Sequence, residues 1–282
     1  MIVALVLVSA FLHAAWNALL RVEPDKDRGL VGAITVASLF ACIVAAIRWA
    51  LGEVPFATNA SLWWTLAAGA FEAVYFMTLA RALELGRLGA VYTVSRGGAI
   101  LVVWPLSILW FAEAATLTST LGSLTVLAGL ALSSLGAAAG GNRDHRAGIL
   151  WAAACAASIA GYHLAYKAAL LAGGNPSATF AVSLSLSALI SIVRIGSDGR
   201  RTLLAVTRTR WYRLALMGLV CGGSFLILME ALARGGSGYV LTLRNTSVLF
   251  AAALAFMIGE RPRRSEMVGA ALVAAGATLM SL

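Results

Sequence analysis

Glu72 is a lone carboxyl group in a long apolar stretch, with Phe71, Tyr75 and Phe76 around it in the sequence. A charged side chain at the centre of a bilayer costs at least about 2.5–3.5 kcal/mol, so it needs a function or a partner there. Because a carboxyl group removed from water favours its neutral form, Glu72 could exchange a proton for a cationic substrate. The alternative is an internal ion pair with Arg96 or with a histidine.

Two arginines also interrupt apolar stretches. Arg96 is flanked by a serine and two glycines, and Arg244 is followed by Asn-Thr-Ser, which indicates polar, loosened helix at both places. A guanidinium group is always charged and fits a carboxylate or a phosphate in two-pronged fashion. Each arginine could therefore hold an anionic group or form a gate. The structural alternative is an arginine that caps carbonyl groups or extends to a lipid headgroup.

Histidines occupy corresponding places in the two halves of the chain. His13 and Asn17 are four residues apart and so share one helix face, and His163 lies in the other half. Histidines titrate near neutral pH and could shuttle protons, or they could form interhelical hydrogen bonds.

Aromatic residues accompany these polar groups. Trp16, Tyr75, Trp104 and Tyr166 lie at depths that a central cavity could reach. Together with Glu72 they could form a cation–π box for a substrate amine. Aromatic residues in apolar helices also serve simply as packing, and this alternative stays open.

The composition indicates that lipid surrounds most of the chain. Hydrophobic residues make up 61% of the 282 residues, charged residues 12%, and the mean hydropathy is +0.89, whereas a soluble domain has about 25% charged residues. Because lipid offers no hydrogen bonds to the backbone, apolar segments of this length must be helices. We predict an all-α membrane protein with ten transmembrane helices at 2–20, 30–51, 61–83, 89–111, 117–137, 148–171, 176–196, 212–234, 238–258 and 265–281.

The sequence repeats itself over two halves, 1–140 and 141–282, which we expect to form one structural domain. His13-x-x-Trp16 recurs as His163-x-x-Tyr166, Arg96 recurs as Arg244, and Glu113, Gly122 and Gly129 recur as Glu260, Gly269 and Gly276. Each half holds five spans, an odd number, so the second half enters the membrane from the opposite side. The sequence thus predicts two inverted five-helix repeats, an arrangement typical of secondary transporters.

The stretch Gly259-Glu260-Arg-Pro followed by Gly269-Ala-Ala-Leu-Val-Ala-Ala-Gly276 resembles the hallmark of the EamA family in the drug/metabolite transporter (DMT) superfamily. The resemblance covers the whole chain and implies a central cavity lined by helices 1, 3, 4, 6, 8 and 9, with helices 5 and 10 at the periphery. The family often has a proline in helix 4 and again in helix 9. Here Pro105 stands in helix 4, but helix 9 has none.

Loop charges predict the orientation. Sixteen of the 21 lysines and arginines lie in the loops after odd-numbered spans or within three residues of them. The positive-inside rule then places these loops in the cytoplasm of a bacterial-type inner membrane and both termini outside, whereas the family resemblance implies cytoplasmic termini. The net charge of +9 belongs to these loops, so we expect no nucleic-acid partner. Glu113 and Glu260 lie just beyond helices 4 and 9, where each could cap the start of the next helix.

We predict a secondary transporter that moves a small polar or zwitterionic metabolite, such as an amino acid or amine, by alternating access with proton coupling or exchange. The alternatives are a channel or a membrane scaffold without cargo. An enzyme is not expected, since neither H-E-x-x-H nor G-x-S-x-G occurs. The three cysteines have no metal-ligand spacing, and no cofactor is expected. The expected partners are a small-molecule substrate, membrane lipid and, through the glycine-rich helices, a second copy in a homodimer.

Overall fold

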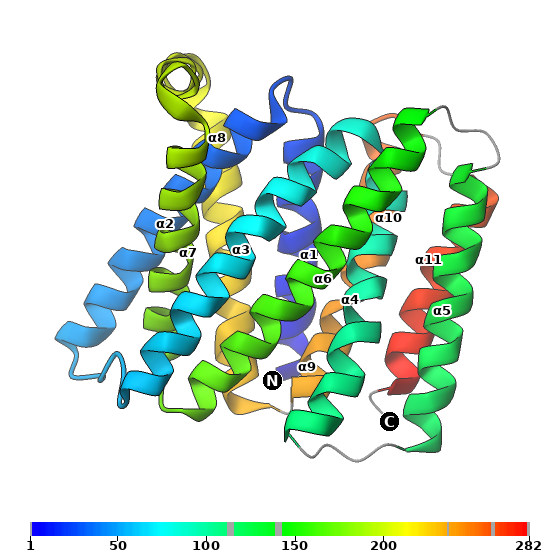
Figure 1. Cartoon of the computed structure of the whole chain (residues 1–282), viewed down its shortest axis with the longest axis horizontal. Coiled ribbons are helices and arrows are strands. Elements are labelled where there is room, and N and C mark those ends of the chain that lie inside the picture. The colour runs from blue at the N-terminus through cyan, green and yellow to red at the C-terminus, as the bar shows by residue number, and fades with distance from the viewer. Residues whose placement is uncertain (1, 112–115, 139–142, 236, 261–262, 281–282) are drawn as a thin grey trace.

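The chain folds into side-by-side helices in a computed structural model, which describes all residues except 1, 112–115, 139–142, 236, 261–262 and 281–282 (Figure 1). The helices of the described residues are α1 (Ile2–Arg21), α2 (Lys26–Ala50), α3 (Asn59–Leu85), α4 (Leu88–Phe111), α5 (Leu117–Ala138), α6 (Arg143–Leu171), α7 (Pro176–Arg194), α8 (Gly196–Arg234), α9 (Ser237–Arg244), α10 (Ser247–Met257) and α11 (Arg264–Met280).

The predicted spans agree with these helices closely. Seven of the helices, α1 to α4 and α6 to α8, are long and apolar enough to cross a membrane. The described parts of α5 and α10 add shorter apolar helices at Thr120–Leu132 and Ser247–Met257. Among the described residues no strand occurs, so the all-helical prediction is confirmed. The described chain has ten helices when α9 and α10 are counted as one, in agreement with the predicted number.

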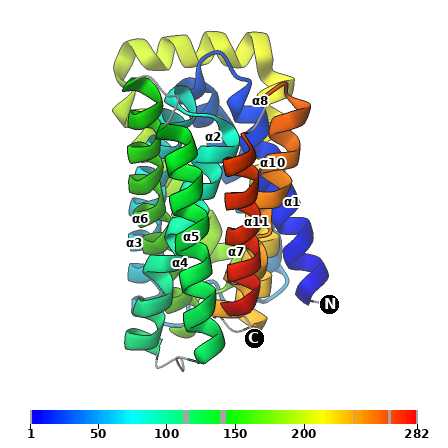
Figure 2. The same ribbon diagram turned by 90° about the vertical axis from the view of Figure 1, so that its right-hand side faces the viewer.

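The polar stretch that we predicted as a loop before residue 212 is helical. α8 starts at Gly196 and changes direction at Arg210, whose φ of −130° and ψ of 24° lie outside the helical range. Its first part lies across one end of the bundle (Figure 2). Leu203 of this part lies beside Gly32 of α2, and Val206 packs against the hydrophobic core. One apolar face among several arginines therefore suffices to hold this segment as a surface helix.

The ninth predicted span is two helices, not one. α9 ends at Arg244 and α10 starts at Ser247. The Asn245 side chain donates to the Leu241 carbonyl at 2.9 Å, and the Thr246 hydroxyl donates to the Leu243 carbonyl at 2.7 Å. Polar side chains that compete for helix carbonyls in this way interrupt a helix without a proline.

Ion pairs join the odd-numbered loops at one end of the bundle. The buried Glu23, after α1, pairs with Arg210 at 3.1 Å and Arg213 at 3.0 Å in α8. Arg21 pairs with Glu260 at 2.7 Å. The other oxygen of Glu260 accepts a hydrogen bond from the Leu88 backbone at 2.9 Å. We predicted that Glu260 caps the helix that follows it, but it caps α4 instead. Glu113, for which we made the same prediction, lies outside the described residues.

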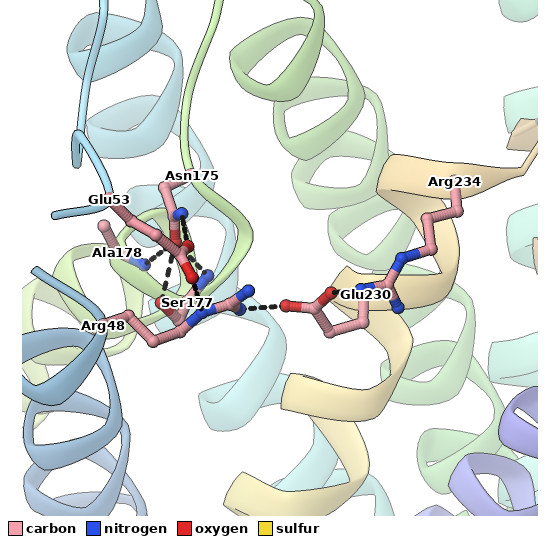
Figure 3. Close-up of polar contacts among 7 residues, drawn as sticks. All are labelled: Arg48, Glu53, Asn175, Ser177, Ala178, Glu230 and Arg234. Carbon is pink, nitrogen blue, oxygen red and sulfur yellow. Dashed lines mark hydrogen bonds and ion pairs between the residues drawn. The ribbon is translucent and has the colours of Figure 1, made fainter. Parts of the chain in front are cut away.

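A second polar network closes the opposite end (Figure 3). Arg48, at the end of α2, binds Glu53 at 2.9 Å and also Glu230 of α8. The Asn175 side chain, before α7, donates to Glu53 at 2.5 Å, while its backbone N–H donates to the Pro55 carbonyl at 2.9 Å. The loops after α2 and α6 and the end of α8 are thereby held together.

Glycines allow α5 and α11 to pack backbone to backbone. A Cβ atom on Gly129 would lie 2.6 Å from the Gly269 carbonyl oxygen, and one on Gly276 would lie 2.6 Å from the Gly122 carbonyl oxygen. Only glycine permits such an approach. These four glycines therefore serve a contact within the chain, and the expected homodimer stays a prediction without a contact here to support it.

Candidate functional site

The imidazole of His13 lies between the two buried arginines in the middle of the bundle. Arg96 from α4 contacts the Nε2 atom of His13, and the Nη2 atom of Arg244 lies 2.8 Å from its Nδ1 atom. Arg244 also donates to the Ser9 hydroxyl at 3.2 Å, one turn before His13 on α1. Arg96 and Arg244 expose only 4% and 2% of their surface. Three helices thus bring together residues that the sequence indicated separately.

Aromatic rings surround this arginine–histidine cluster, which consists of His13, Arg96 and Arg244. The guanidinium carbon of Arg96 lies 5.9 Å from the ring centre of Tyr75 and 5.7 Å from that of Tyr92. Cation–π contacts of this kind partly compensate for the loss of water around a buried cation. The Trp16 indole donates to His13 Nδ1 at 3.2 Å.

Glu72 is bound by hydroxyl groups. The Ser183 hydroxyl of α7 donates to Glu72 Oε2 at 2.7 Å, and the Tyr166 hydroxyl of α6 lies 3.0 Å from the Ser183 oxygen. Ser183 has one proton to donate, so Tyr166 donates to Ser183 when the carboxyl group is ionised. Glu72 is completely buried, and its Oε1 atom has no partner among the described residues. The alternative of an ion pair with Arg96 is not realised in this arrangement.

Tyr162 lies between the arginine–histidine cluster and Glu72. Its ring centre is 5.3 Å from Tyr75, 6.1 Å from Phe225 and 5.7 Å from Tyr166. His163 stacks against Tyr162 at 4.5 Å. Within the described chain, the Tyr162 hydroxyl and His163 Nδ1 are both buried without a hydrogen-bond partner. Burying a polar group without a hydrogen-bond partner costs free energy. The two unpartnered groups beside the arginine–histidine cluster therefore indicate a place for a polar ligand or water.

Two predicted site residues contribute differently. The Asn17 amide donates to the His13 carbonyl at 2.7 Å and so serves the helix backbone, although its oxygen is unpartnered in the described structure. Trp104 is partly exposed and stands eight residues, or about 12 Å, beyond Arg96 on α4.

Tyr75 lies against Arg96, while Tyr166 reaches Glu72 through Ser183. The four aromatic residues of the predicted box thus lie in different surroundings.

The sequence interpretation missed several residues of the site. Tyr92 stands four positions before Arg96, and Ser9 stands four positions before His13, so helical spacing could have indicated both. Phe225, whose ring lies 4.7 Å from the Arg244 guanidinium carbon, carries no such signal. Ser183 is one of several serines in α7, and only the packing of α7 on α3 shows which of them meets Glu72.

The electrostatics of the site favour an anion beside the arginines. Among the described residues, no carboxylate pairs with Arg96 or Arg244, and the Nε atom of Arg244 has no acceptor there. Two buried cations that share one imidazole are costly unless an opposite charge joins them. A carboxylate or phosphate could supply that charge. The described residues contain no group of three or more His, Cys, Asp and Glu side chains that could hold a metal ion.

Comparisons with known proteins match the second half of the chain to a family and the whole chain to a known fold. Residues 146–282 match the model of the EamA-like transporter family. No curated protein matches the chain. A protein of known crystal structure is similar over 99% of this chain and 96% of its own, with a TM-score of 0.68 and 19% identity. At that identity the likeness concerns the fold alone.

Proposed function

Because the chain belongs to the EamA-like transporter family, as residues 146–282 show, we propose that it carries a small zwitterionic metabolite, such as an amino acid or amine-bearing acid, by alternating access. The observation on which this rests is the buried pair Arg96 and Arg244, which share His13 and have no carboxylate partner among the described residues. A substrate carboxylate would provide the missing negative charge.

The tautomer of His13 supports this role for Arg96. A neutral imidazole has one N–H donor and one acceptor nitrogen, and a guanidinium group can only donate. Nδ1 faces two donors, Arg244 at 2.8 Å and Trp16 at 3.2 Å, so it acts as the acceptor. Nε2 then carries the proton and faces Arg96. Both groups are hydrogen-bond donors, so neither can accept from the other. A carboxylate that bound Arg96 would relieve this conflict and could also accept from His13.

Glu72 is the group that we propose for the substrate amine or for the coupling proton. Its Oε2 atom is bound by Ser183, which leaves Oε1 to accept from an ammonium group or to take up a proton. Tyr162 lies between the arginine–histidine cluster and Glu72, and it presents an aromatic face and a hydroxyl group. A zwitterion could place its carboxylate at the arginines and its ammonium group at Glu72. It would then neutralise both sites, whereas a substrate with only one of these charges would leave the other site unpaired.

Alternating access would follow from an inverted repeat, which two sets of contacts support. Gly129 approaches Gly269, and their counterparts Gly276 and Gly122 approach each other in the same way. This reciprocity is typical of a twofold axis that passes between α5 and α11. Ser38 of α2 and Ser185 of α7 lie 2.8 Å from each other. They stand 147 residues apart, the same offset that separates Gly129 from its counterpart Gly276 and Gly122 from Gly269.

The two ends of the bundle would then act as gates. Glu23 with Arg210 and Arg213 holds one end, and Arg48 with Glu53 and Glu230 holds the other (Figure 3). In alternating access, the two networks would open one at a time, so that the site would face only one side of the membrane at any moment. The end that carries α8's arginine-rich first part is proposed to face the cytoplasm of a bacterial inner membrane, which places both termini outside.

Uptake into proteoliposomes tests the proposal. The panel pairs each amino acid with the amine that lacks its carboxylate and the acid that lacks its amine, with and without a pH gradient. We expect saturable uptake of a zwitterion and at least tenfold weaker uptake of both partial analogues, because each loses a charge-assisted contact. Arg96→Gln and Glu72→Gln should abolish the preference, whereas the surface variant Arg81→Gln should keep it. Equal uptake of all three analogues, or a wild-type preference in Arg96→Gln, would contradict the proposal.

A further inference from the structure

Hydroxyl groups line one face of α7 at every fourth residue. Thr179, Ser183, Ser187 and Ser191 are all buried, with 1% exposure at most. Residues four apart on a helix lie one above another, so the four hydroxyls form a continuous stripe. Twelve residues of helix rise by about 18 Å, more than half of a bilayer's hydrocarbon thickness of roughly 30 Å. Ser183, within this stripe, is the residue that binds Glu72.

The other hydroxyls of the stripe are free where comparable ones are not. A serine or threonine in an apolar helix normally donates to the carbonyl four residues earlier. Ser185 of the same helix does so, at 2.6 Å from the Ala181 oxygen. In contrast, the side-chain hydroxyls of Thr179, Ser187 and Ser191 have no hydrogen-bond partner within the described chain. Their side chains are thus oriented for a partner that the helix itself does not provide.

We propose that this hydroxyl face of α7, defined by Thr179, Ser183, Ser187 and Ser191, is a proton path that leads to Glu72. The unpartnered Oε1 atom of Glu72 is an independent indication, since it is fully buried and belongs to the group that Ser183 binds. The inference rests on the proposed role of Glu72 and adds the route by which its proton arrives.

The spacing of the hydroxyls suits a chain that includes water. Side chains four residues apart on a helix are separated by about 5–6 Å, and a hydroxyl hydrogen bond spans about 2.7–2.8 Å. A single bridging water molecule between successive hydroxyls would match this spacing. Each hydroxyl or water would accept one proton and release another, so that one proton enters beside Ser191 and one passes from Ser183 to Glu72 Oε2, the oxygen that Ser183 binds. No group on the path keeps a net charge.

Both ends of the hydroxyl face reach polar surroundings. Ser191 stands three residues before Arg194, which pairs with Asp27 at the arginine-rich end. Thr179 stands four residues after Asn175, which belongs to the network at the opposite end. The path thus passes Glu72 and continues beyond it. Access from one end at a time would depend on which network is closed.

Other ionisable groups around Glu72 must be considered in any pH experiment. They are Tyr162 and Tyr166 on α6, Cys221 on α8 and Arg244 on α9, all within electrostatic reach. None of them belongs to the hydroxyl face of α7. Removal of hydroxyls from Ser187 and Ser191 therefore changes the path and leaves these charges as they are.

The test compares the double variant Ser187→Ala/Ser191→Ala with Ser185→Ala, which removes a hydroxyl from another face of α7. After a pH jump, the infrared carbonyl band of protonated Glu72, assigned by its loss in Glu72→Gln, reports proton arrival without any substrate. We expect the double variant to slow this step about tenfold, the factor for one or two ordinary hydrogen bonds. Ser185→Ala should match the wild type, and Ser187→Thr/Ser191→Thr should restore the rate.

Distinct results separate this inference from the proposed function. If the band responds equally fast in the double variant and the wild type, the path is wrong, while the role of Glu72 stands. If Glu72→Gln has no effect on the band or on proton-driven uptake, the proposed role of Glu72 fails and the path fails with it. Equal slowing by Ser185→Ala would also overturn the path, because it would show a general effect of hydroxyl loss in α7.

Discussion

Arg96 and Arg244 approach the imidazole of His13 from its two opposite nitrogen atoms. One residue of α1 thereby connects α4 with the end of α9, and two like charges are held in the same buried cluster. The stability of the fold does not require two buried arginines here, since apolar residues of similar size would avoid the cost of removing charges from water. An anion that joined the cluster during the transport cycle would offset that cost.

Replacing an arginine of this cluster should weaken binding of a carboxylate-bearing substrate. Hydrogen bonds to charged groups contribute about 1.5–3 kcal/mol each, so Arg96→Gln should raise the apparent KM about 10- to 100-fold. Arg96→Lys should recover only part of this, because lysine lacks the planar fork. Proteoliposome uptake kinetics measure the effect. An unchanged KM in Arg96→Gln would remove the arginine from the binding site.

Substitution of the glycines between α5 and α11 should destabilise the fold. A Cβ on Gly129 or Gly276 would lie 2.6 Å from a backbone oxygen, which forces the helices apart. We expect Gly129→Ala and Gly276→Ala each to cost about 1–3 kcal/mol, as overpacking usually does. Thermal unfolding in detergent provides the measurement. Gly223→Ala is the matched control, because nothing lies within 4 Å of its added Cβ, and equal Tm values for all three variants would argue against the close contact.

The sequence predicted the spans well because the burial of apolar side chains and the satisfaction of backbone hydrogen bonds both act locally along each helix. It missed the break after Arg244, since Asn245 and Thr246 read as ordinary polar residues until their hydrogen bonds to the helix are seen. It also missed the helix before Arg210, because a segment rich in arginine looks like a loop when the bundle end that receives Leu203 is unknown.

The site was predictable only in its parts. Charged residues in apolar helices are conspicuous, so Glu72, Arg96 and Arg244 could be selected from the sequence. Their grouping could not, because it depends on how α1, α4 and α9 pack. The sequence left Glu72 free to pair with Arg96, whereas the packing of α7 gives it Ser183. The regular spacing of serines in α7 was a signal that helical periodicity could have revealed.

The network around Glu53 should open as the pH falls. Hydrogen bonds from Arg48 and Asn175 lower the pKa of the Glu53 carboxyl below its usual value of 4.5. A carboxyl with a lowered pKa keeps its contacts above the usual value and loses them as the pH falls through the lowered one. The NMR signal of the Asn175 side-chain amide should therefore shift with a midpoint below 4.5. The transition should vanish in Glu53→Gln, and a midpoint at or above the usual value would contradict the network.

Removing the carboxylate of Glu23 should loosen the helix that lies across the arginine-rich end. Glu23 is 3% exposed and pairs with Arg210 and Arg213, whose side chains are 38% and 36% exposed. Breaking a fully buried pair costs about 3–5 kcal/mol, and solvent around the two arginines reduces this to about 1–3 kcal/mol in Glu23→Gln. Thermal unfolding gives the loss of stability, and trypsin cleavage after Arg200 and Arg201 reports whether the helix has detached.

Asp25→Asn is the control for that experiment, because Asp25 lies two residues away and its ion pair with Arg28 is about one-third exposed at both partners. Exposed pairs of this kind contribute about 0–1 kcal/mol, so Asp25→Asn should leave both the Tm and the cleavage rate close to those of the wild type. Faster cleavage in Glu23→Gln alone would show that the buried carboxylate anchors the bend at Arg210. If both variants are cleaved like the wild type, the first part of α8 is held by its apolar face, with Leu203 on α2, and the ion pairs only follow it.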